Sequence, residues 1–287
     1  MGDYLSVVID GKKMAKEIIE GLKPRIQRLK KKNIIPTLAI VLLGDNPASK
    51  VYIRNKQRAC EEIGMHSVLY EFPEGMKEEK LINLIKKLNK DKKIHGIIVQ
   101  LPLPKYIDEK RILNTISPEK DVDGLHPFNI GNLLLGNEFI APCTPKGIIR
   151  MLERMKIKIE KKNVVIVNNS NVVGKPLAAM LTNRFATVTL CHVKTKYLRE
   201  HTKKADILIT ATGVPKLIKK GMVKEKAVVI DGGIKYVQEK IFGDVDFDII
   251  KDIASYITPV PGGVGPMTVA MVLENTVILA EKFGGKK

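Results

Sequence analysis

A tyrosine and a lysine lie one helical turn apart in the first quarter of the chain. Tyr52 and Lys56 have the i, i+4 spacing that places two side chains next to each other on one face of a helix. A lysine amine acts as a base near neutral pH when partial burial lowers its pKa. The plainer interpretation is a half-buried aromatic ring beside a solvated lysine, and the spacing alone favours it. Lys56 is therefore a candidate base that needs further support.

A glutamine and two aspartates supply further candidate groups. Gln100 is the first polar residue after the apolar run 96–99, and polar groups at the carboxyl end of a parallel strand lie where α/β proteins bind ligands. Asp121 and Asp123 lie in a short loop that ends at Gly124. Their carboxylates can bond the local backbone of a turn, or one of them can accept a paired hydrogen bond from the donor edge of a ligand. These residues alone do not identify a substrate.

A third candidate site is the segment 167–176, which joins a predicted strand to a predicted helix. Backbone N–H groups at a helix N-terminus attract anions, and a dinucleotide pyrophosphate suits this position. Asn168 stands where the Gly-x-Gly-x-x-Gly pattern has its first glycine, and asparagine tolerates left-handed backbone better than most residues. The next strand ends without the acidic residue that reads the ribose of NAD, so His192 or Lys194 can meet the phosphate of NADP. Taken alone, the turn favours an ordinary strand-to-helix connection.

The elements that position these residues alternate between strand and helix. The first series has strand-like runs at 37–43, 67–72 and 96–101, and helices over 12–32, 49–64 and 77–89. The second has strand-like runs at 163–167, 186–191, 206–210 and 227–230, helices over 144–155 and 174–184, and a last apolar helix over 266–283. Ser49 and Thr144 are expected to cap the helices that they begin, and Gly64 to end the first of these. The alternation predicts mostly parallel sheets with helices on their faces.

The expected fold class is α/β with two domains and an active-site cleft between them. Residues 1–142, completed by the C-terminal helix 266–287, form the predicted substrate domain. Residues 143–265 form the predicted Rossmann-type nucleotide-binding domain. A length of 287 residues accommodates two ordinary domains.

Composition argues against several classes of protein. The chain carries 49 Lys and Arg against 31 Asp and Glu, and the net charge of +18 by itself suggests a nucleic-acid partner. Because 40 of these basic residues are Lys, only 5% of residues are aromatic and there is no Trp, a solvated Lys-rich surface is the better interpretation. Three cysteines without a CxxC pair favour a reducing compartment and disfavour disulfides and a structural zinc. No apolar run approaches the roughly 20 residues of a membrane span.

Taken together, five segments resemble the bifunctional methylenetetrahydrofolate dehydrogenase/methenyltetrahydrofolate cyclohydrolase family. They are Ser49-Lys50-Val51-Tyr52 through Lys56, Val99-Gln100-Leu101-Pro102-Leu103-Pro104, Lys120-Asp121-Val122-Asp123-Gly124-Leu125, Pro142-Cys143-Thr144-Pro145-Lys146-Gly147, and the stretch from Thr258 to Thr268. The resemblance spans nearly the whole chain in the family's order. It implies NAD(P)-dependent oxidation of 5,10-methylenetetrahydrofolate to the 5,10-methenyl cation, followed by hydrolysis to 10-formyltetrahydrofolate. The predicted substrate domain is then a folate-binding catalytic domain.

The resemblance also implies roles for the candidate residues. In the family, the lysine that matches Lys56 is the catalytic acid or base, chiefly for the hydrolysis, and the glutamine that matches Gln100 sets its position and proton state. The tyrosine that matches Tyr52 stacks on the aminobenzoyl ring of folate. The aspartate that matches Asp123 accepts the donor edge of the pterin. A glycine-rich loop lets backbone approach the folate closely; its residues are Pro261, Gly262 and Gly263.

The same resemblance implies a nicotinamide cofactor, NADP by the family's pattern. The matching positions are Asn168, Asn169, Ser170, Gly174, Val193, Lys194, Thr212, Gly213 and Ile234. Asn169 replaces the family's usual arginine and Val193 its usual serine, and both usual residues hold the 2′-phosphate of NADP. Three outcomes stay open: Lys194, Lys175 or His192 substitutes; the enzyme uses NAD or either cofactor; or the dehydrogenase is impaired while the cyclohydrolase survives. We expect NADP to be retained with reduced discrimination against NAD.

The family further implies tetrahydrofolate derivatives as partners, polyglutamylated forms included, a homodimer, and a cytoplasmic place in one-carbon metabolism and purine biosynthesis. It implies no metal, no nucleic acid and no membrane. Three rival functions are weaker. A shikimate-type or amino-acid dehydrogenase shares the two-domain plan but does not explain Tyr52, Lys56, Gln100 and Asp123 together. A nucleic-acid-binding protein rests on charge alone, and a monofunctional cyclohydrolase would lack the cofactor-dependent step.

Overall fold

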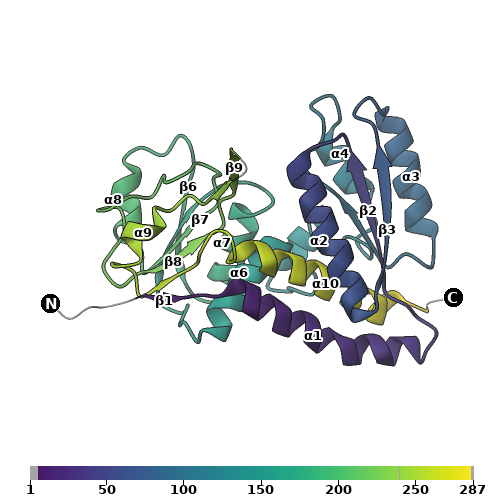
Figure 1. Ribbon diagram of the computed structural model, residues 1–287, viewed down its shortest axis with the longest axis horizontal. Helices are drawn as coiled ribbons and strands as arrows, with labels where there is room; N and C mark the ends of the chain where they lie inside the picture. The colour runs from purple at the N-terminus through teal and green to yellow at the C-terminus, as the bar shows by residue number, and fades with distance from the viewer. Residues whose placement is uncertain (1–5, 239, 286–287) are drawn as a thin grey trace. The chain divides into compact units, whose positions relative to one another are not determined.

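The computed structural model describes residues 6–238 and 240–285, which fall into two units (Figure 1). Within these residues, unit 1 comprises 6–15, Leu133–Glu138 and Thr144–Thr268. Unit 2 comprises Lys16–Asn132, Phe139–Cys143 and 269–285. Each unit is built on its own sheet of parallel strands, which confirms the predicted α/β class.

Unit 2 contains a three-stranded parallel sheet in the order β3-β2-β4. Every residue of β2, the middle strand, is buried, as expected for a strand covered on both faces. Alternate residues of β2 pack with apolar residues of α3 and α4 in one core, and Figure 1 shows α2 on the other side of the sheet from α3. The strands are β2 (Thr37–Leu43), β3 (His66–Phe72) and β4 (Gly96–Val99), and the helices wholly within the unit are α2 (Pro47–Ile63), α3 (Glu78–Lys90) and α4 (Glu109–Thr115).

Unit 1 contains a six-stranded parallel sheet in the order β1-β11-β8-β7-β5-β6. β6 pairs with one side of β5 and β7 with the other, so the chain reverses its direction across the sheet at β5. In doubly wound folds the ligand crevice lies at such a switch point, beyond the carboxyl ends of the strands. The strands are β1 (Val7–Val8), β5 (Asn163–Val167), β6 (Thr187–Cys191), β7 (Ile207–Thr210), β8 (Val228–Asp231) and β11 (Tyr256–Ile257).

The remaining elements of unit 1 are short helices and one hairpin, and four of the described helices contribute residues to both units. The short helices are α7 (Gly174–Thr182), α8 (Leu198–Thr202) and α9 (Phe247–Ile250), and the hairpin pairs β9 (Lys235–Val237) with β10 (Lys240–Phe242). The helices shared between units are α1 (Gly11–Lys30), α5 (Pro127–Leu134) and α10 (Val264–Phe283), and α6 (Cys143–Arg154) begins with one residue of unit 2.

The structure corrects two predicted helix caps. Asn46, not Ser49, caps α2: its side chain accepts a hydrogen bond from the Ser49 N–H at 3.2 Å, with Pro47 at the first helical position. α6 begins at Cys143, so Thr144 lies inside the helix that it was expected to cap. Gly64 ends α2 in the left-handed conformation at φ 77°, as predicted.

The N-terminal strand lies in a different unit from the predicted one. β1 pairs with β11 through Val7 and Tyr256, so residues 6–15 belong to unit 1, although the sequence places 1–142 in the substrate domain. Val7 and Val8 form the edge strand of the six-stranded sheet, and the other strands of that sheet come much later in the chain. Residues 1–5 and 286–287, at the two ends of the predicted substrate domain, lie outside the described residues.

The last helix differs from the expectation that the chain lacks a long apolar stretch. Within the described residues, α10 is the helix with the length and hydropathy of a membrane span: it has 20 residues, and a window of 18 of them has a mean hydropathy of 1.2. Of that window, 72% is buried inside the protein. A helix that is apolar on all sides is typical of a protein core as well as of a membrane span, and its burial favours the core.

Candidate active site

The amine of Lys56 is buried and held in one direction. Lys56 lies on α2, where its side chain is only 5% exposed, and its Nζ donates a hydrogen bond of 3.0 Å to Oε1 of Gln100. Burial lowers the pKa of the Lys56 amine, and the negative charge of Asp123 opposes that shift. A buried lysine with a lowered pKa exchanges protons at a pH closer to neutral than a solvated one. The interpretation of Lys56 as a solvated surface lysine is wrong.

Gln100 is held in place by two backbone carbonyls, one bonded to its own N–H and one to its side chain. It directly follows β4, and its N–H donates to the carbonyl of Val41 on the neighbouring strand at 2.9 Å. The side-chain Nε2 donates to the carbonyl of Leu101 at 2.9 Å. This second bond uses the donor end of the amide, so the acceptor Oε1 points toward Lys56. The strand end thus presents a polar group as the sequence predicts.

Asp123 lies close enough to Lys56 for each charge to affect the other. Burial raises the pKa of the Asp123 carboxyl to about 6, while the positive charge of Lys56 and a hydrogen bond with the Cys143 thiol oppose the rise. The residue itself is half-buried, so one part of it still faces solvent. An acid titrating near 6 beside an amine with a lowered pKa forms a pair suited to proton transfer near neutral pH.

Asp121 and Asp123 have different roles, although the sequence treats them alike. Oδ2 of Asp121 accepts hydrogen bonds of 2.8 Å from the N–H of His126 and from Nδ2 of Asn129. Asp121 is 2% exposed and closes the local turn, which is the structural role that the sequence allows for such a residue. Asp123 instead faces Lys56 and Cys143.

The turn that carries Asp123 is held by residues from distant parts of the chain. Gly124 adopts φ +68°, and a Cβ there would lie 2.7 Å from the backbone of Ala141. The fully buried Asn275 of α10 donates from Nδ2 to the carbonyls of Val122 at 2.8 Å and Ala141 at 3.1 Å. The Cys143 thiol donates to the Val122 carbonyl at 3.3 Å. The sequence prediction omits Asn275 and Cys143 from the site. Asn275 could have been recognised as a polar side chain among the apolar residues of the last helix.

Tyr52 lies on α2 one turn before Lys56 and is half-buried. The predicted spacing on one helix face is therefore present. Stacking on a substrate ring stays a prediction. The loop with Pro261, Gly262 and Gly263 belongs to unit 1, whereas Tyr52 and Lys56 belong to unit 2.

The loop at Pro261 has a tightly defined backbone. Gly262 adopts φ +111°, and its carbonyl accepts a hydrogen bond of 2.9 Å from the N–H of Lys12. A Cβ at Gly11 would lie 2.0 Å from the carbonyl oxygen of Gly263, and the peptide bond before Pro261 is cis. The start of α1 thus packs directly on the glycines of the loop, and any side chain at this crossing would clash.

Asn168 organises the turn between β5 and α7. Its Oδ1 accepts hydrogen bonds from the N–H of Ser170 at 2.8 Å, the Ser170 hydroxyl at 2.8 Å and the N–H of Gly174 at 3.0 Å. Its Nδ2 donates to the carbonyl of Ala211, just beyond β7, at 2.6 Å. The expected reason for asparagine here is wrong, because Asn168 does not adopt left-handed backbone. The residue is a side-chain bridge across the switch point of the sheet.

The same turn has backbone donors for an anion. A Cβ at Gly174 would lie 1.9 Å from the carbonyl oxygen of Asn168, so only glycine allows α7 to begin this close to the end of β5. In the part of the chain that the structure describes, the N–H groups of Asn171 and Val172 have no acceptor. Two such amides near the start of a helix suit a pyrophosphate.

The end of β6 is exposed and carries few groups for a 2′-phosphate. Val193 is 94% exposed, and Nδ1 of His192 accepts a hydrogen bond from the Lys194 N–H at 3.1 Å. The hydroxyl of Thr195 accepts from the His192 N–H at 2.9 Å. The sequence prediction omits Thr195, whose hydroxyl three residues after the strand end shapes this loop. Lys175 donates to Oδ1 of Asn171 at 2.7 Å.

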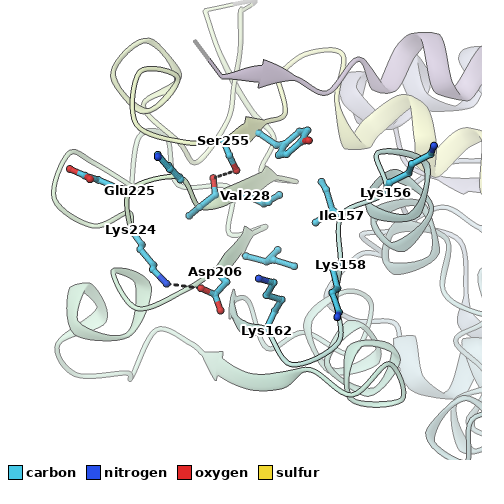
Figure 2. A pocket seen from close by; sticks show the side chains of 13 residues that line it. Lys156, Ile157, Lys158, Lys162, Asp206, Lys224, Glu225, Val228 and Ser255 are labelled. Carbon is cyan, nitrogen blue, oxygen red and sulfur yellow. Dashed lines mark hydrogen bonds and ion pairs between the residues drawn. The ribbon is translucent and has the colours of Figure 1, made fainter. Parts of the chain in front are cut away.

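A separate cavity lies at the opposite, amino edge of the same sheet. Its volume is about 490 Å³, and its lining residues lie at the starts of β5, β7, β8 and β11. Figure 2 shows the side chains that line it. Lys224 and Asp206 form an ion pair of 2.6 Å there, and Lys156 and Lys158 point in opposite directions from either side of Ile157. None of the predicted site residues lines this cavity. Among residues 6–238 and 240–285, no group of three His, Cys, Asp or Glu could hold a metal ion.

Two family models match the chain. The catalytic domain of tetrahydrofolate dehydrogenase/cyclohydrolase matches residues 9–123, and the NAD(P)-binding domain of the same family matches residues 142–283. The chain belongs to the tetrahydrofolate dehydrogenase/cyclohydrolase family. Lys56, Gln100 and Asp123 therefore lie in its catalytic domain, and the Asn168 turn lies in its NAD(P)-binding domain.

Individual members of the tetrahydrofolate dehydrogenase/cyclohydrolase family are similar over nearly their whole length. The bifunctional protein FolD of Nitratiruptor is 51% identical over 276 residues, covering 96% of this chain and 98% of that protein. The crystal structure of the bifunctional FolD enzyme from Campylobacter jejuni is 49% identical with a TM-score of 0.94, covering 96% of this chain and 99% of that one. The Trypanosoma brucei FolD structure in complex with NADP is 36% identical with a TM-score of 0.94, covering 97% and 98% of the two chains.

Proposed function

We propose that the chain is a bifunctional enzyme that oxidises 5,10-methylenetetrahydrofolate to 5,10-methenyltetrahydrofolate with a nicotinamide cofactor and hydrolyses the product to 10-formyltetrahydrofolate. The observation that carries the proposal is the buried Lys56 amine bonded to Gln100 at 3.0 Å beside Asp123. Family membership and the FolD relatives support both activities.

The proposed hydrolysis uses Lys56 as the group that moves protons. Water attacks the methenyl carbon between the two folate nitrogens, a C–O bond forms, and the neutral amine of Lys56 accepts the proton that the water loses. The protonated Lys56 amine then returns this proton to N5 and the C–N5 bond breaks. The hydroxyl oxygen forms the C=O of the formyl group on N10, and its proton is released to solvent. Gln100 keeps the amine aimed at one place through its Oε1, and a base positioned in this way typically contributes about 10²–10⁴-fold in rate.

Asp123 and Tyr52 are proposed to hold the folate. An ionised Asp123 can accept two hydrogen bonds from the amino and ring N–H groups of the pterin, and charge-assisted bonds of this kind are about twice as strong as neutral ones. Tyr52 lies one turn from Lys56 on α2, where its ring can stack on the aminobenzoyl group. The loop with Pro261, Gly262 and Gly263 is proposed to contact the folate through its backbone.

The cofactor is proposed to be NADP, with weaker discrimination against NAD than is usual in the family. When bound, the nicotinamide accepts the hydride from the methylene carbon, and the protein supplies binding and orientation. The turn that would receive the pyrophosphate contains Asn168, Asn169, Ser170 and Gly174. The backbone N–H groups of Asn171 and Val172, which have no acceptor among the described residues, fit that group. The other residues proposed to contact the cofactor are Val193, Lys194, Thr212, Gly213 and Ile234. The NADP complex of the Trypanosoma relative supports the choice.

The experiment that tests the proposal measures both activities on the purified protein. Formation and loss of the methenyl chromophore are followed with methylenetetrahydrofolate and either NADP or NAD, and then with methenyltetrahydrofolate alone. We expect both activities, with a higher kcat/KM for NADP. Hydrolysis without oxidation would favour a monofunctional cyclohydrolase, and a strong advantage for NAD would refute the NADP assignment. A homodimer, polyglutamylated substrates and a cytoplasmic location are proposed from the family, and sedimentation of the purified protein tests the first.

A further inference from the structure

Two buried aspartates form one hydrogen-bonded system at the carboxyl ends of β7 and β8. Asp244 has no solvent exposure and Asp231 only 3%. Asp231 is the last residue of β8, and its carboxylate accepts hydrogen bonds from the N–H groups of Gly233 at 2.9 Å, Asp244 at 3.1 Å and Val245 at 2.9 Å. The side chain of Asp231 therefore holds the backbone of Asp244 in place.

The side chain of Asp244 in turn holds the segment that follows β7. Its Oδ2 accepts hydrogen bonds from the Thr210 hydroxyl at 2.7 Å and the Thr212 N–H at 2.5 Å. Its Oδ1 accepts from the Val214 N–H at 3.0 Å. All three partners donate their hydrogen bonds to this one carboxylate. The segment 210–214 thus has three anchor points on one rigid, fully buried group.

The backbone around the two carboxylates is packed too closely for side chains. A Cβ at Gly233 would lie 2.0 Å from Oδ1 of Asp244, and a Cβ at Gly243 would lie 2.1 Å from Oδ2 of Asp231. Gly213, which lies between the two anchored amides, adopts φ +70°. The segment after β7 therefore has one defined shape, and Asp244 sets it.

We infer that Asp244 is a positioning residue for the nicotinamide cofactor, because it fixes Thr212 and Gly213 at the edge of the sheet where a dinucleotide binds. The inference rests on the proposed function, since it takes Thr212 and Gly213 as cofactor contacts. Asp244 itself does not touch the cofactor; it acts through the segment 210–214. The donors that the Asp244 carboxylate holds are on Thr210, Thr212 and Val214, and none of these is proposed to contact folate. Oxidation and hydrolysis should therefore respond differently to the loss of this carboxylate.

The test is the variant Asp244→Asn in the full chain. Its amide keeps the shape of the carboxylate but turns an N–H₂ group toward at least one of the three donors, so the segment loses an anchor. We expect the Kd for NADPH, measured by fluorescence titration, and the KM for NADP to rise at least about tenfold, which corresponds to about 1.4 kcal/mol. The kcat/KM for hydrolysis of methenyltetrahydrofolate should stay within about twofold of the wild-type value.

Asp206→Asn is the matched control. Asp206 lies in the same unit at the opposite edge of the same sheet, where Oδ1 pairs with Lys224 at 2.6 Å and Oδ2 accepts from the Asn163 N–H at 2.9 Å (Figure 2). Its loss should lower the melting temperature without changing the Kd for NADPH. If Asp244→Asn does not fold, Thr210→Val removes one donor from the same carboxylate and should weaken NADPH binding in the same direction by a smaller factor.

The outcomes separate this inference from the proposed function. An unchanged Kd for NADPH in the Asp244→Asn and Thr210→Val variants, or an equal change in Asp206→Asn, would overturn the positioning role. A loss of hydrolysis equal to the loss of NADPH binding would also overturn it, because it would indicate general damage. A wild-type protein that binds NADPH without oxidising folate would contradict the proposed function, while the Kd comparison would still decide the role of Asp244. A wild-type protein that binds neither NADPH nor NADH would overturn both.

Discussion

Lys56 and Gln100 are joined by a hydrogen bond of 3.0 Å between Nζ and Oε1, although 44 residues separate them in the chain. The bond connects the middle of α2 to the carboxyl end of β4. It keeps a nearly inaccessible amine aimed at one place, where burial lowers its pKa. This relationship underlies the first prediction.

Lys56→Met should abolish hydrolysis of methenyltetrahydrofolate while the protein stays folded. Methionine replaces a buried amine with an apolar chain of similar length, so the cost of burying a charge disappears, and the Gln100 acceptor loses one partner. We expect kcat for hydrolysis to fall by at least about 10²-fold, in line with loss of a positioned acid or base. Stopped-flow decay of the methenyl chromophore measures this rate, and circular dichroism checks the fold. Near-normal hydrolysis would remove Lys56 from the mechanism.

Folate binding should depend on pH through Asp123, whose pKa is raised to about 6 by burial. If the ionised carboxylate accepts the pterin, the affinity for folate is highest well above pH 6, where Asp123 is ionised. It decreases as the pH falls through about 6 and the carboxyl takes up a proton. Asp123→Asn should weaken folate binding at pH 7.5 by roughly 1.5–3 kcal/mol, which is about 10- to 150-fold, and should abolish the pH dependence. Fluorescence titration with a folate analogue from pH 5 to 8 measures both effects. An unchanged affinity would remove Asp123 from the site.

The raised pKa of Asp123 also predicts how stability depends on pH, and this dependence runs opposite to that of folate affinity. The folded state holds the Asp123 proton more tightly than the unfolded state, so this group favours folding at low pH and loses that contribution as the pH rises through about 6. The neutral side chain of Asp123→Asn should therefore leave the melting temperature at pH 7.5 equal to or above that of the wild type. A marked decrease would show that the ionised carboxylate stabilises the fold, contrary to the direction of its pKa shift.

Asn275→Leu should damage the folate site from a distance. Removing Nδ2 leaves the buried carbonyls of Val122 and Ala141 without this donor, at a cost of about 1–3 kcal/mol for each group that stays unpaired. The turn that carries Asp123 loosens, so the KM for folate should rise in both reactions. Asn183→Leu is the control. It removes a hydrogen bond of 2.8 Å from Nδ2 of Asn183 to the Leu133 carbonyl in unit 1, and it should lower stability without changing the KM for folate.

The double variant Asn169→Arg with Val193→Ser should increase the preference for NADP over NAD. It restores a charge-assisted contact and a hydroxyl at the two positions that depart from the family's usual pattern. We expect the ratio of kcat/KM values for the two cofactors to rise by at least about tenfold, which corresponds to one additional charge-assisted bond of about 1.5 kcal/mol. An unchanged ratio would indicate that other residues read the 2′-phosphate.

Local patterns predicted most of the elements and placed Lys56 on a helix and Gln100 at the end of a strand, because helix spacing and strand ends are properties of short segments. The pairing of these two residues was implied only by the family resemblance. The pattern could not separate Asp121 from Asp123, since both stand in the same loop and only their partners differ. It omitted Asn275 because the carbonyls it bonds are 153 and 134 residues away. It gave the wrong reason for Asn168, whose side chain bridges two strands rather than relieving a strained backbone.

The bridge made by Asn168 has a kinetic consequence. Because its single amide bonds the turn internally and ties it to Ala211 across the sheet, the turn has a defined shape before any partner arrives. A dinucleotide that meets such a turn has little backbone entropy to remove. Association should then be limited by diffusion and orientation, and differences among related cofactors should appear mainly in how long each one stays bound.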